Sequence, residues 1–470
     1  MDAVDIAFAG PSRQAELVRT GEVSAQELTE LYLERIERID PEVNAYRTVM
    51  AERALAEANQ ADQRRGAGEE RPLLGVPLAV KDNVDVAGEL TTHGTAAHDR
   101  TPAAADAELV RRLRGAGAVI IGKTNMPELA IIGDTESSTF GVTRNPWNPD
   151  RSVGGSSGGS GAAVAAGLAS AAHATDGAGS IRIPAANCGL FGLKPQRGRV
   201  SLMPDARHWH GLSVAGALTR SVRDNALLLD VMSGPAPGDE HEARPPERPF
   251  AEAAGESPGR LRVAMSTLPF APTRLHAEVR QALEETAELL RSLGHTVAKA
   301  DPAYNELGAN FMPRFLKGMQ EEGEAMARPE RLSRRTRGFA RLGRAIHPAA
   351  LRLALRDEAR QTSRILRLFH DHDVLLTPVT ARPPIRAGQW EGLGALRTLA
   401  GMSFTYPYTA PWNATGQPAA SVPAGFTRAG LPLAVQLIGR PHDEATLYSL
   451  AGQVEAERPW ADRRPPAASQ

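Results

Sequence analysis

Two serines lie in glycine-rich turns and could carry out nucleophilic chemistry. Ser156 stands in the turn 154–161, with the sequence GGSSGGSG, and Ser180 ends the turn 176–180, with the sequence DGAGS. A serine that attacks a carbonyl carbon needs backbone N–H donors beside it to hold the developing oxyanion. A flexible linker is a poor alternative, because the run of small residues at 162–172 predicts a buried helix between the turns.

Two other glycine-rich sites fit the sequence less well. A phosphate-binding loop needs Gly-Lys-Ser/Thr after the first turn, or G-x-G-x-x-G at the start of a turn, and neither pattern is present. Residues 154–158 match G-x-S-x-G by letter, but no apolar strand leads into them. The strand-to-helix elbow of an α/β-hydrolase, with a histidine as base, is therefore not supported.

A serine hydroxyl needs a base, and Lys81 is the candidate. Lys81 ends the apolar stretch 76–80, which predicts a buried strand. Burial lowers the pKa of a lysine, and a base near neutral pH needs a value of about 7–8 rather than about 10.4. Considered alone, a lysine at a strand end is expected to reach solvent. The two serine turns downstream are the reason to assign Lys81 the role of base instead. Lys123 follows a similar stretch at 118–122 and is the rival candidate.

Taken together, these motifs resemble those of the amidase signature family of serine hydrolases. The resemblance covers most of the chain and is weakest over 235–401. It implies a Ser–Ser–Lys triad in which Ser180 is the nucleophile, Ser156 relays the proton after a cis peptide bond, and Lys81 is the base. In this pattern Lys123 is structural. The matching segments are 75–83, 154–160, 175–184, 188–195, 413–419 and 430–439.

The resemblance also implies an oxyanion hole made of four consecutive backbone N–H groups. These groups belong to Gly177, Ala178, Gly179 and Ser180. Ala178 departs from the family pattern, which usually has glycine at this position. Its methyl group leaves the N–H donor in place but requires a φ angle that alanine tolerates.

The substrate pocket is expected to be lined by aromatic side chains. Trp209 stands in a loop expected near the site, within the sequence RHWH at 207–210. His208 and His210 in the same loop could bind a metal ion, but no third ligand is evident nearby, so no metal is expected. For every pocket candidate the alternative is ordinary core packing. The substrate-binding candidates are Trp209, Phe311, Phe315 and Trp412, with Met312 and Trp390 as further wall residues.

The alternation of predicted strands and helices indicates one large α/β domain. We expect a central mixed, mostly parallel twisted β-sheet covered by helices on both faces. A helix preceded by a capping box at Ser24 is expected to stop at Pro41. The whole chain, 1–470, is expected to be one amidase domain: 1–234 and 401–460 form the core with the catalytic motifs, 235–400 is a variable helical region that shapes the pocket, and 460–470 is a loose tail.

Composition narrows the class of protein. The 54 basic and 55 acidic residues balance, which argues against a general affinity for nucleic acid or for acidic membranes. The arginines of 328–367 are accordingly interpreted as a solvated helical face rather than a nucleic-acid surface. The single cysteine, Cys188, excludes an internal disulfide and fits a reducing compartment. No membrane span and no signal peptide is evident, so we expect a soluble, cytoplasmic protein.

The function expected from these features is hydrolysis of the C–N bond of carboxamides through an acyl-enzyme on Ser180. The resemblance extends to aryl amides, esters and carbamates (urethanes) as substrates, and the stretch 143–201 is similar to 6-aminohexanoate cyclic dimer hydrolases. We expect a small-molecule substrate and no cofactor, and a homodimer is compatible with the sequence. The alternatives are the glutaminase subunit of a tRNA-dependent amidotransferase and a non-catalytic binding protein. The presence of all three triad positions argues against the latter.

Overall fold

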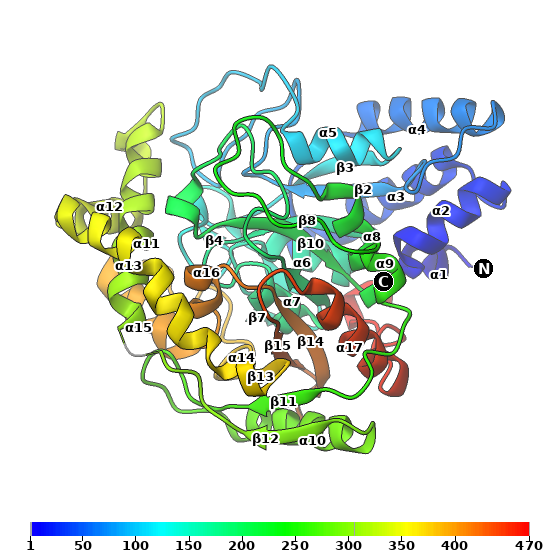
Figure 1. Cartoon of the computed structure of the whole chain (residues 1–470). Coiled ribbons are helices and arrows are strands. Elements are labelled where there is room, and N and C mark those ends of the chain that lie inside the picture. Colours follow the sequence, from blue (N-terminus) through cyan, green and yellow to red (C-terminus); the bar gives the residue numbers. More distant parts are fainter. Residues whose placement is uncertain (1, 305, 470) are drawn as a thin grey trace.

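An 11-stranded mixed β-sheet forms the centre of the molecule (Figure 1). The computed structural model describes residues 2–304 and 306–469. In spatial order the strands are β1 (Tyr46–Val49), β3 (Val119–Thr124), β2 (Pro77–Lys81), β8 (Ala171–Asp176), β10 (Val214–Thr219), β9 (Phe191–Lys194), β14 (Ala419–Phe426), β15 (Pro432–Ile438), β13 (Val374–Pro378), β11 (Arg262–Met265) and β12 (Thr296–Lys299). Two small sheets are formed by β4 (Glu136–Ser137) with β5 (Gly141–Val142) and by β6 (Arg144–Asn145) with β7 (Asn148–Ser152).

The middle of the sheet is antiparallel, and parallel pairs lie on either side of it. All pairings from β8 through β10, β9, β14 and β15 to β13 are antiparallel. β2 runs parallel to β3 and β8, and β11 runs parallel to β12 and β13. The expected α/β class with a mixed sheet is confirmed, whereas the expectation of mostly parallel pairing is wrong. One reason is that β14 and β15 are joined by the short turn 427–431, and so short a connection makes its strands antiparallel.

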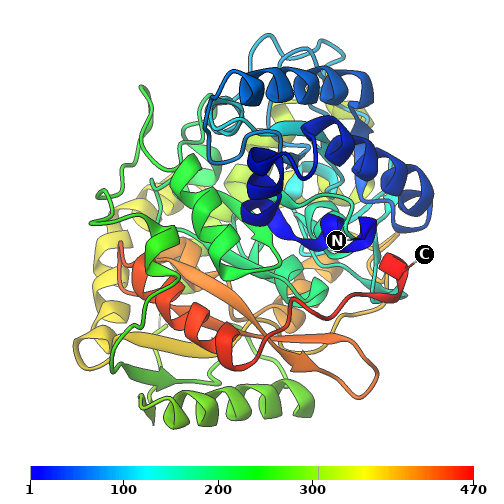
Figure 2. The same cartoon turned by 90° about the vertical axis from the view of Figure 1, so that its right-hand side faces the viewer.

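Helices cover both faces of the sheet (Figures 1 and 2). Strand residues alternate between the two layers: in β2, Leu78 and Val80 join one apolar cluster and Ala79 joins another. By the same alternation Lys81 follows on the side of Ala79. The first layer contains α8 (Val222–Met232), α10 (Ala277–Ser292) and α17 (Glu444–Glu457), and the second contains α6 (Gly158–Ala165) and α7 (Arg182–Cys188).

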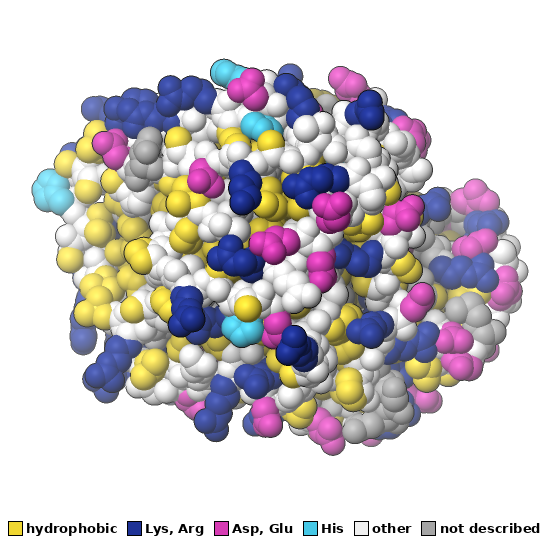
Figure 3. All heavy atoms as spheres, turned by 90° about the horizontal axis from the view of Figure 1, so that it is seen from below, with side chains coloured by type: hydrophobic (Ala, Val, Ile, Leu, Met, Phe, Trp, Pro, Cys, Tyr) yellow, Lys and Arg dark blue, Asp and Glu magenta, His cyan; other side chains and the backbone are white. Residues whose placement is uncertain are grey.

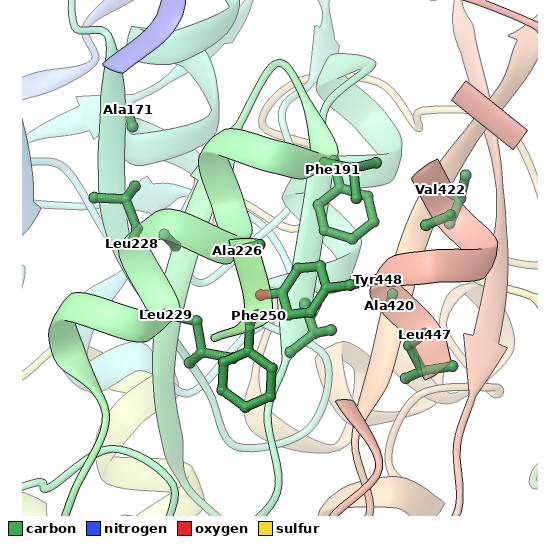
Figure 4. Close-up of a cluster of buried hydrophobic side chains, with 14 of the residues drawn as sticks. Ala171, Phe191, Ala226, Leu228, Leu229, Phe250, Ala420, Val422, Leu447 and Tyr448 are labelled. Atoms are coloured by element: carbon green, nitrogen blue, oxygen red, sulfur yellow. The ribbon is translucent and has the colours of Figure 1, made fainter. Parts of the chain in front are cut away.

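The largest apolar cluster lies between α8, α17 and the middle of the sheet (Figure 4). Tyr448 of α17 packs between Phe191 and Phe250, with ring centroids 6.0 Å and 5.7 Å apart. Its buried hydroxyl donates a hydrogen bond to the side-chain oxygen of Asn225 at 2.8 Å. This close-packed cluster includes residues of β2 and β8 and so restricts the movement of the strands that carry the site.

Two expected helix boundaries differ from the structure. α3 (Ala25–Val43) begins with the expected capping box at Ser24 but continues past Pro41, because proline in the last turn disturbs few of the helix's hydrogen bonds. The small-residue run 162–172 is not one helix: α6 ends at Ala165, and β8 begins at Ala171. Gly167, with a φ of 67°, turns the chain between them.

The remaining helices surround this framework. The two ends of the chain lie on the same side of the molecule (Figure 2), where Arg464 pairs with Asp5 at 2.6 Å. Residue 470 of the expected tail lies outside the described residues. The other helices are α1 (Ala3–Phe8), α2 (Gly10–Thr20), α4 (Ala51–Gly66), α5 (Glu108–Gly115), α9 (Phe250–Ala253), α11 (Leu307–Ala325), α12 (Arg334–Arg344), α13 (Pro348–Leu366), α14 (Leu368–Asp371), α15 (Ala395–Thr405) and α16 (Pro411–Thr415), with short 3-10 turns η1 (Glu128–Ala130), η2 (His208–Gly211), η3 (Pro329–Arg331) and η4 (Pro466–Ser469).

Candidate active site

The ends of two neighbouring parallel strands and the start of a helix meet at the site. β2 ends at Lys81, and β8 pairs parallel to it and ends at Asp176. The serine turn precedes α6, and the peptide bond between Gly155 and Ser156 is cis, as expected. Glycine is required at position 155, because a Cβ there would lie 2.5 Å from the carbonyl oxygen of Asp134. The turn is therefore pressed against a neighbouring backbone and has one shape.

Lys81 is fully buried and reaches two hydroxyl groups. Its Nζ lies 2.7 Å from Ser156 Oγ and 2.8 Å from Thr175 Oγ1. Burial lowers the pKa of Lys81 from 10.5 to about 7, against the opposing negative charges of Asp176 and Glu322. The amine is therefore present in its neutral, proton-accepting form over a large part of the ordinary pH range.

The rival candidate Lys123 has a different environment. Its Nζ pairs with the carboxylate of Asp82 at 3.2 Å and donates to the carbonyl oxygen of Leu90 and to Thr91 Oγ1, each at 2.8 Å. Burial lowers the pKa of Lys123, and Asp82 offsets part of this effect. These contacts are consistent with the structural role that the family resemblance implies for Lys123.

Asp176 organises the turn that carries Ser180. Its carboxylate accepts hydrogen bonds from the backbone N–H of Gly179 at 2.6 Å and of Ile181 at 3.1 Å. It also pairs with the fully buried guanidinium of Arg182 at 2.9 Å. Burial alone would raise the pKa of Asp176, but Arg182 holds it at about 2, so the carboxylate is ionised. A buried pair of this kind fixes the geometry of the turn around it.

One expected oxyanion donor is occupied. In the described structure the N–H of Gly179 is donated to Asp176 rather than left open to an oxyanion, and its expected role stays a prediction. The φ of 133° at Gly179 turns this peptide toward the carboxylate. Ala178 is not among the described non-glycine residues with a positive φ, so its methyl group is tolerated. The backbone N–H groups of Gly177, Ala178 and Ser180 remain as candidate donors.

A cavity of 350 Å³ opens beside Ser180. None of the described residues that line it carries a charge, and most are apolar or aromatic. Among the expected pocket residues, Trp209, Phe311, Met312 and Phe315 line it. The Trp209 ring meets Phe315 edge-on, with centroids 5.2 Å apart. We call this space the apolar cavity.

Two expected wall residues lie behind the apolar cavity rather than in its surface. Trp412 is fully buried, donates from Nε1 to the carbonyl oxygen of Tyr408 at 3.0 Å and packs against Tyr304, which does line the cavity. Trp390 in the same way packs against the cavity residue Tyr406. Their expected direct role is therefore wrong, because each supports an aromatic residue that forms the wall.

The histidines beside Trp209 pair with α11. Nε2 of His208 contacts Glu322, and Nε2 of His210 lies 3.0 Å from Glu321. No group of three or more His, Cys, Asp or Glu side chains in the described part of the chain is arranged to hold a metal ion.

Sequence reasoning missed two polar contributors to the site. Thr175 is the second acceptor for Lys81, and the side chain of Asn413 donates to Asp176 Oδ1 at 2.9 Å. Thr175 immediately precedes the second glycine turn, and Asn413 begins a matching motif, so their positions were visible. Their partners were not, since Asn413 contacts a residue more than two hundred positions away.

Comparison with known proteins identifies the family of the chain. Residues 27–448 match the Amidase family. A putative amidase AmiB2 of Mycobacterium bovis is 53% identical over 473 residues, covering 99% of both chains, and a 6-aminohexanoate-cyclic-dimer hydrolase of Pseudomonas sp. strain NK87 is 36% identical, covering 99% of this chain and 98% of that one. A solved structure of 6-aminohexanoate cyclic dimer hydrolase with substrate has a TM-score of 0.88 at 35% identity, covering 98% of this chain and 99% of that chain.

The chain therefore belongs to the amidase signature family. It is a hydrolase that acts on carbon–nitrogen bonds other than peptide bonds, in amides. In the described residues, no helix combines the length and apolarity needed to cross a membrane. On the face seen from below, acidic and basic side chains intermingle rather than gather by sign (Figure 3).

Proposed function

We propose that the chain hydrolyses carboxamides through an acyl-enzyme formed on Ser180. The observation that carries this proposal is the buried amine of Lys81, with a pKa of about 7, lying 2.7 Å from Ser156 Oγ. A neutral amine so placed accepts a proton near neutral pH, and a serine hydroxyl can carry that proton to it.

In the first half of the reaction, Ser180 Oγ attacks the carbonyl carbon. Its proton passes to Ser156, and the hydroxyl proton of Ser156 passes to Lys81. The N–H groups at 177, 178 and 180 stabilise the tetrahedral oxyanion, each donor contributing about 3 kcal/mol. The C–N bond then breaks as Ser156 gives a proton to the leaving nitrogen and is reprotonated by Lys81. The products are a free amine and an acyl ester on Ser180.

In the second half, water attacks the acyl ester. The water gives a proton to the same Ser156–Lys81 relay, and the tetrahedral intermediate collapses with loss of the Ser180 oxygen. The relay returns the proton to that oxygen, which restores the hydroxyl group and the neutral lysine. No net proton is gained or lost by the enzyme.

The apolar cavity supports a neutral acyl group as substrate. Its described lining offers aromatic and aliphatic contacts and no charged partner, so an apolar or aromatic acyl chain is favoured. Cyclic amides, as in the named activity of the 36% identical relative, meet this requirement, and so do aryl esters and carbamates. Much of the wall comes from the region 235–400, including Tyr304, Phe311 and Phe315, and we propose that this region sets substrate choice.

Replacement of the nucleophile tests the proposal directly. In Ser180→Ala we expect kcat/KM for an aryl amide to fall more than about a thousandfold with the melting temperature unchanged. Ser138→Ala, which removes an exposed serine, is the matched control and keeps its activity. Aryl amide, ester and carbamate substrates with one common leaving group identify the preferred bond. Substantial turnover by Ser180→Ala would remove Ser180 from the mechanism.

A glutaminase subunit is the second candidate, and the cavity argues against it. Glutamine carries an ammonium and a carboxylate, and a site for it needs charged partners that the described lining of the apolar cavity does not supply. We expect the purified chain alone to hydrolyse small neutral amides. Activity restricted to glutamine, and only with partner subunits present, would favour the glutaminase.

A further inference from the structure

A second cavity, of 270 Å³, is lined by Thr175, one of the two hydroxyl partners of Lys81. It shares no lining residue with the apolar cavity. η2 separates the two, since Trp209 lines the first cavity and the adjacent His208 lines the second. Its wall combines the apolar residues Leu109 and Leu202 with the carboxylates of Asp85 and Asp205. We call it the polar cavity.

The polar cavity reaches the catalytic groups through two hydroxyls. Thr175, which lines it, accepts the hydrogen bond from Lys81 Nζ at 2.8 Å. Ser213 also lines it and lies close to the turn 176–180, because a Cβ on Gly177 would be 3.3 Å from Ser213 Oγ. Asn83 donates to Thr175 Oγ1 at 3.3 Å, and its own side-chain oxygen is buried without a hydrogen-bond partner in the described structure. An unused acceptor is thus available beside the proton relay.

The direction of proton transfer decides which part of the substrate lies here. Amide cleavage requires the leaving nitrogen to receive a proton, and in the proposed function that proton comes from Ser156 and Lys81. The amine must therefore depart on the side of the relay, while the acyl group occupies the apolar cavity. We propose that the polar cavity binds the amine side of the substrate and favours amines that carry a positive charge; this inference rests on the proposed function.

Charge in the polar cavity supports the choice of a cationic amine. Glu322 raises the pKa of His208 against the effect of burial, so the pair formed by these two residues is close to neutral as a whole. Burial lowers the pKa of His93, which keeps that imidazole uncharged. Asp205 lies 3.8 Å from the same Nε2 of His208, so one imidazolium faces the carboxylates of Glu322 and Asp205. With Asp85 also in the wall, the balance of charge is negative. An amine with a second, protonated nitrogen is attracted by this negative charge, and an amine with a carboxylate is repelled.

The experiment uses amides with one acyl group and different amines. Benzoyl amides of ammonia, butylamine, 1,4-diaminobutane and 4-aminobutanoate vary the size and the charge of the amine only. For the unmodified protein we expect kcat/KM for the diamine amide to exceed that for the aminobutanoate amide at least tenfold. Asp205→Asn, at the exposed mouth of the polar cavity, should reduce this preference at least threefold.

Filling each cavity in turn separates the two binding sites. Leu202→Trp fills the polar cavity and should lower the ratio of butylamide to primary amide turnover at least tenfold. Met312→Trp fills the apolar cavity and should instead lower the ratio of large to small acyl groups. Calorimetric binding of free 1,4-diaminobutane to Ser180→Ala, lost in its Leu202→Trp derivative, gives a readout independent of turnover.

The outcomes distinguish this inference from the proposed function. If Leu202→Trp changes acyl preference, or if neither ratio moves in a protein that hydrolyses amides, the polar cavity is not the amine site. If the unmodified protein hydrolyses none of these amides, the proposed function fails, and this inference fails with it.

Discussion

The pH dependence of turnover tests whether Lys81 acts as a neutral base. With a pKa of about 7, half of the lysine is neutral at pH 7, about a tenth at pH 6 and about a hundredth at pH 5. A lysine with its ordinary pKa of 10.5 would be neutral in only about one molecule in three thousand at pH 7. Burial therefore increases the reactive form about a thousandfold.

The assay is kcat/KM for an aryl amide from pH 5 to 9.5 at constant ionic strength. We expect a tenfold rise per pH unit below about 7 and a plateau above it, because kcat/KM reports the free enzyme. Lys81→Arg is the control, since a guanidinium does not lose its proton in this range. This substitution should abolish the activity and with it the rise of kcat/KM below pH 7. A flat profile between pH 5 and 9, or a limb centred near 10, would refute the assignment of Lys81 as base.

The same buried amine makes stability depend on pH. Between pH 7 and about 10 the unfolded chain binds one more proton at Lys81 than the folded chain does, so stability rises with pH; below pH 7 the cost of burial is at its full value. Lys81→Met removes this dependence. The unfolding free energy of Lys81→Met relative to the unmodified chain should therefore decrease by about 1.4 kcal/mol per pH unit over this range. Urea unfolding at pH 7.5, 8.5 and 9.5 measures it, and a constant difference would contradict the lowered pKa.

Three further substitutions test the surroundings of the site. Thr175→Val removes an acceptor that favours the charged form of Lys81, so the acid limb of kcat/KM should move to lower pH. The same change removes one of the two contacts that position the amine, so the plateau of kcat/KM should fall at least tenfold, and Thr175→Ser should restore both. Gly177→Ala places a Cβ 2.9 Å from the ring of Trp209 and should lower kcat/KM at least tenfold, with partial recovery when Trp209→Phe is added. Arg182→Met leaves a fully buried carboxylate unpaired and should cost about 3–5 kcal/mol in urea unfolding.

The features that the sequence predicts best are those set by neighbouring residues. Lys81 follows a short apolar strand. Ser156 and Ser180 lie in glycine-rich turns that match neither a phosphate-binding loop nor an α/β-hydrolase elbow. The capping box at Ser24 is likewise local and is present in the structure. These patterns locate the site because the strand end and the turns supply its backbone.

The features that sequence reasoning missed depend on contacts distant along the chain. The N–H of Gly179 donates to the carboxylate of Asp176 instead of pointing to an oxyanion. That carboxylate, three residues earlier, is held in place by Arg182 and Asn413. Trp412 has the aromatic side chain expected of a pocket wall, but Tyr304 from another segment packs against it and lines the apolar cavity in its place. Apart from β14 and β15, which a short turn joins, the antiparallel pairs in the middle of the sheet depend on how strands distant along the chain meet, and residue periodicity does not encode this.

Two buried lysines at the ends of adjacent strands illustrate how one fold assigns different roles to the same residue type. Lys81 and Lys123 are both fully buried near the ends of the adjacent strands β2 and β3, where Lys81 lies opposite Thr124 and Lys123 lies opposite Val80. Lys123 pairs with Asp82, and a partner of opposite charge favours the charged form of an amine, which offsets part of the effect of burial on its pKa. In the described structure Lys81 makes no ion pair and contacts hydroxyls, which stabilise a charge less than a carboxylate does. The distribution of carboxylates, more than the burial that both lysines share, therefore decides which of them can be neutral and act as a base.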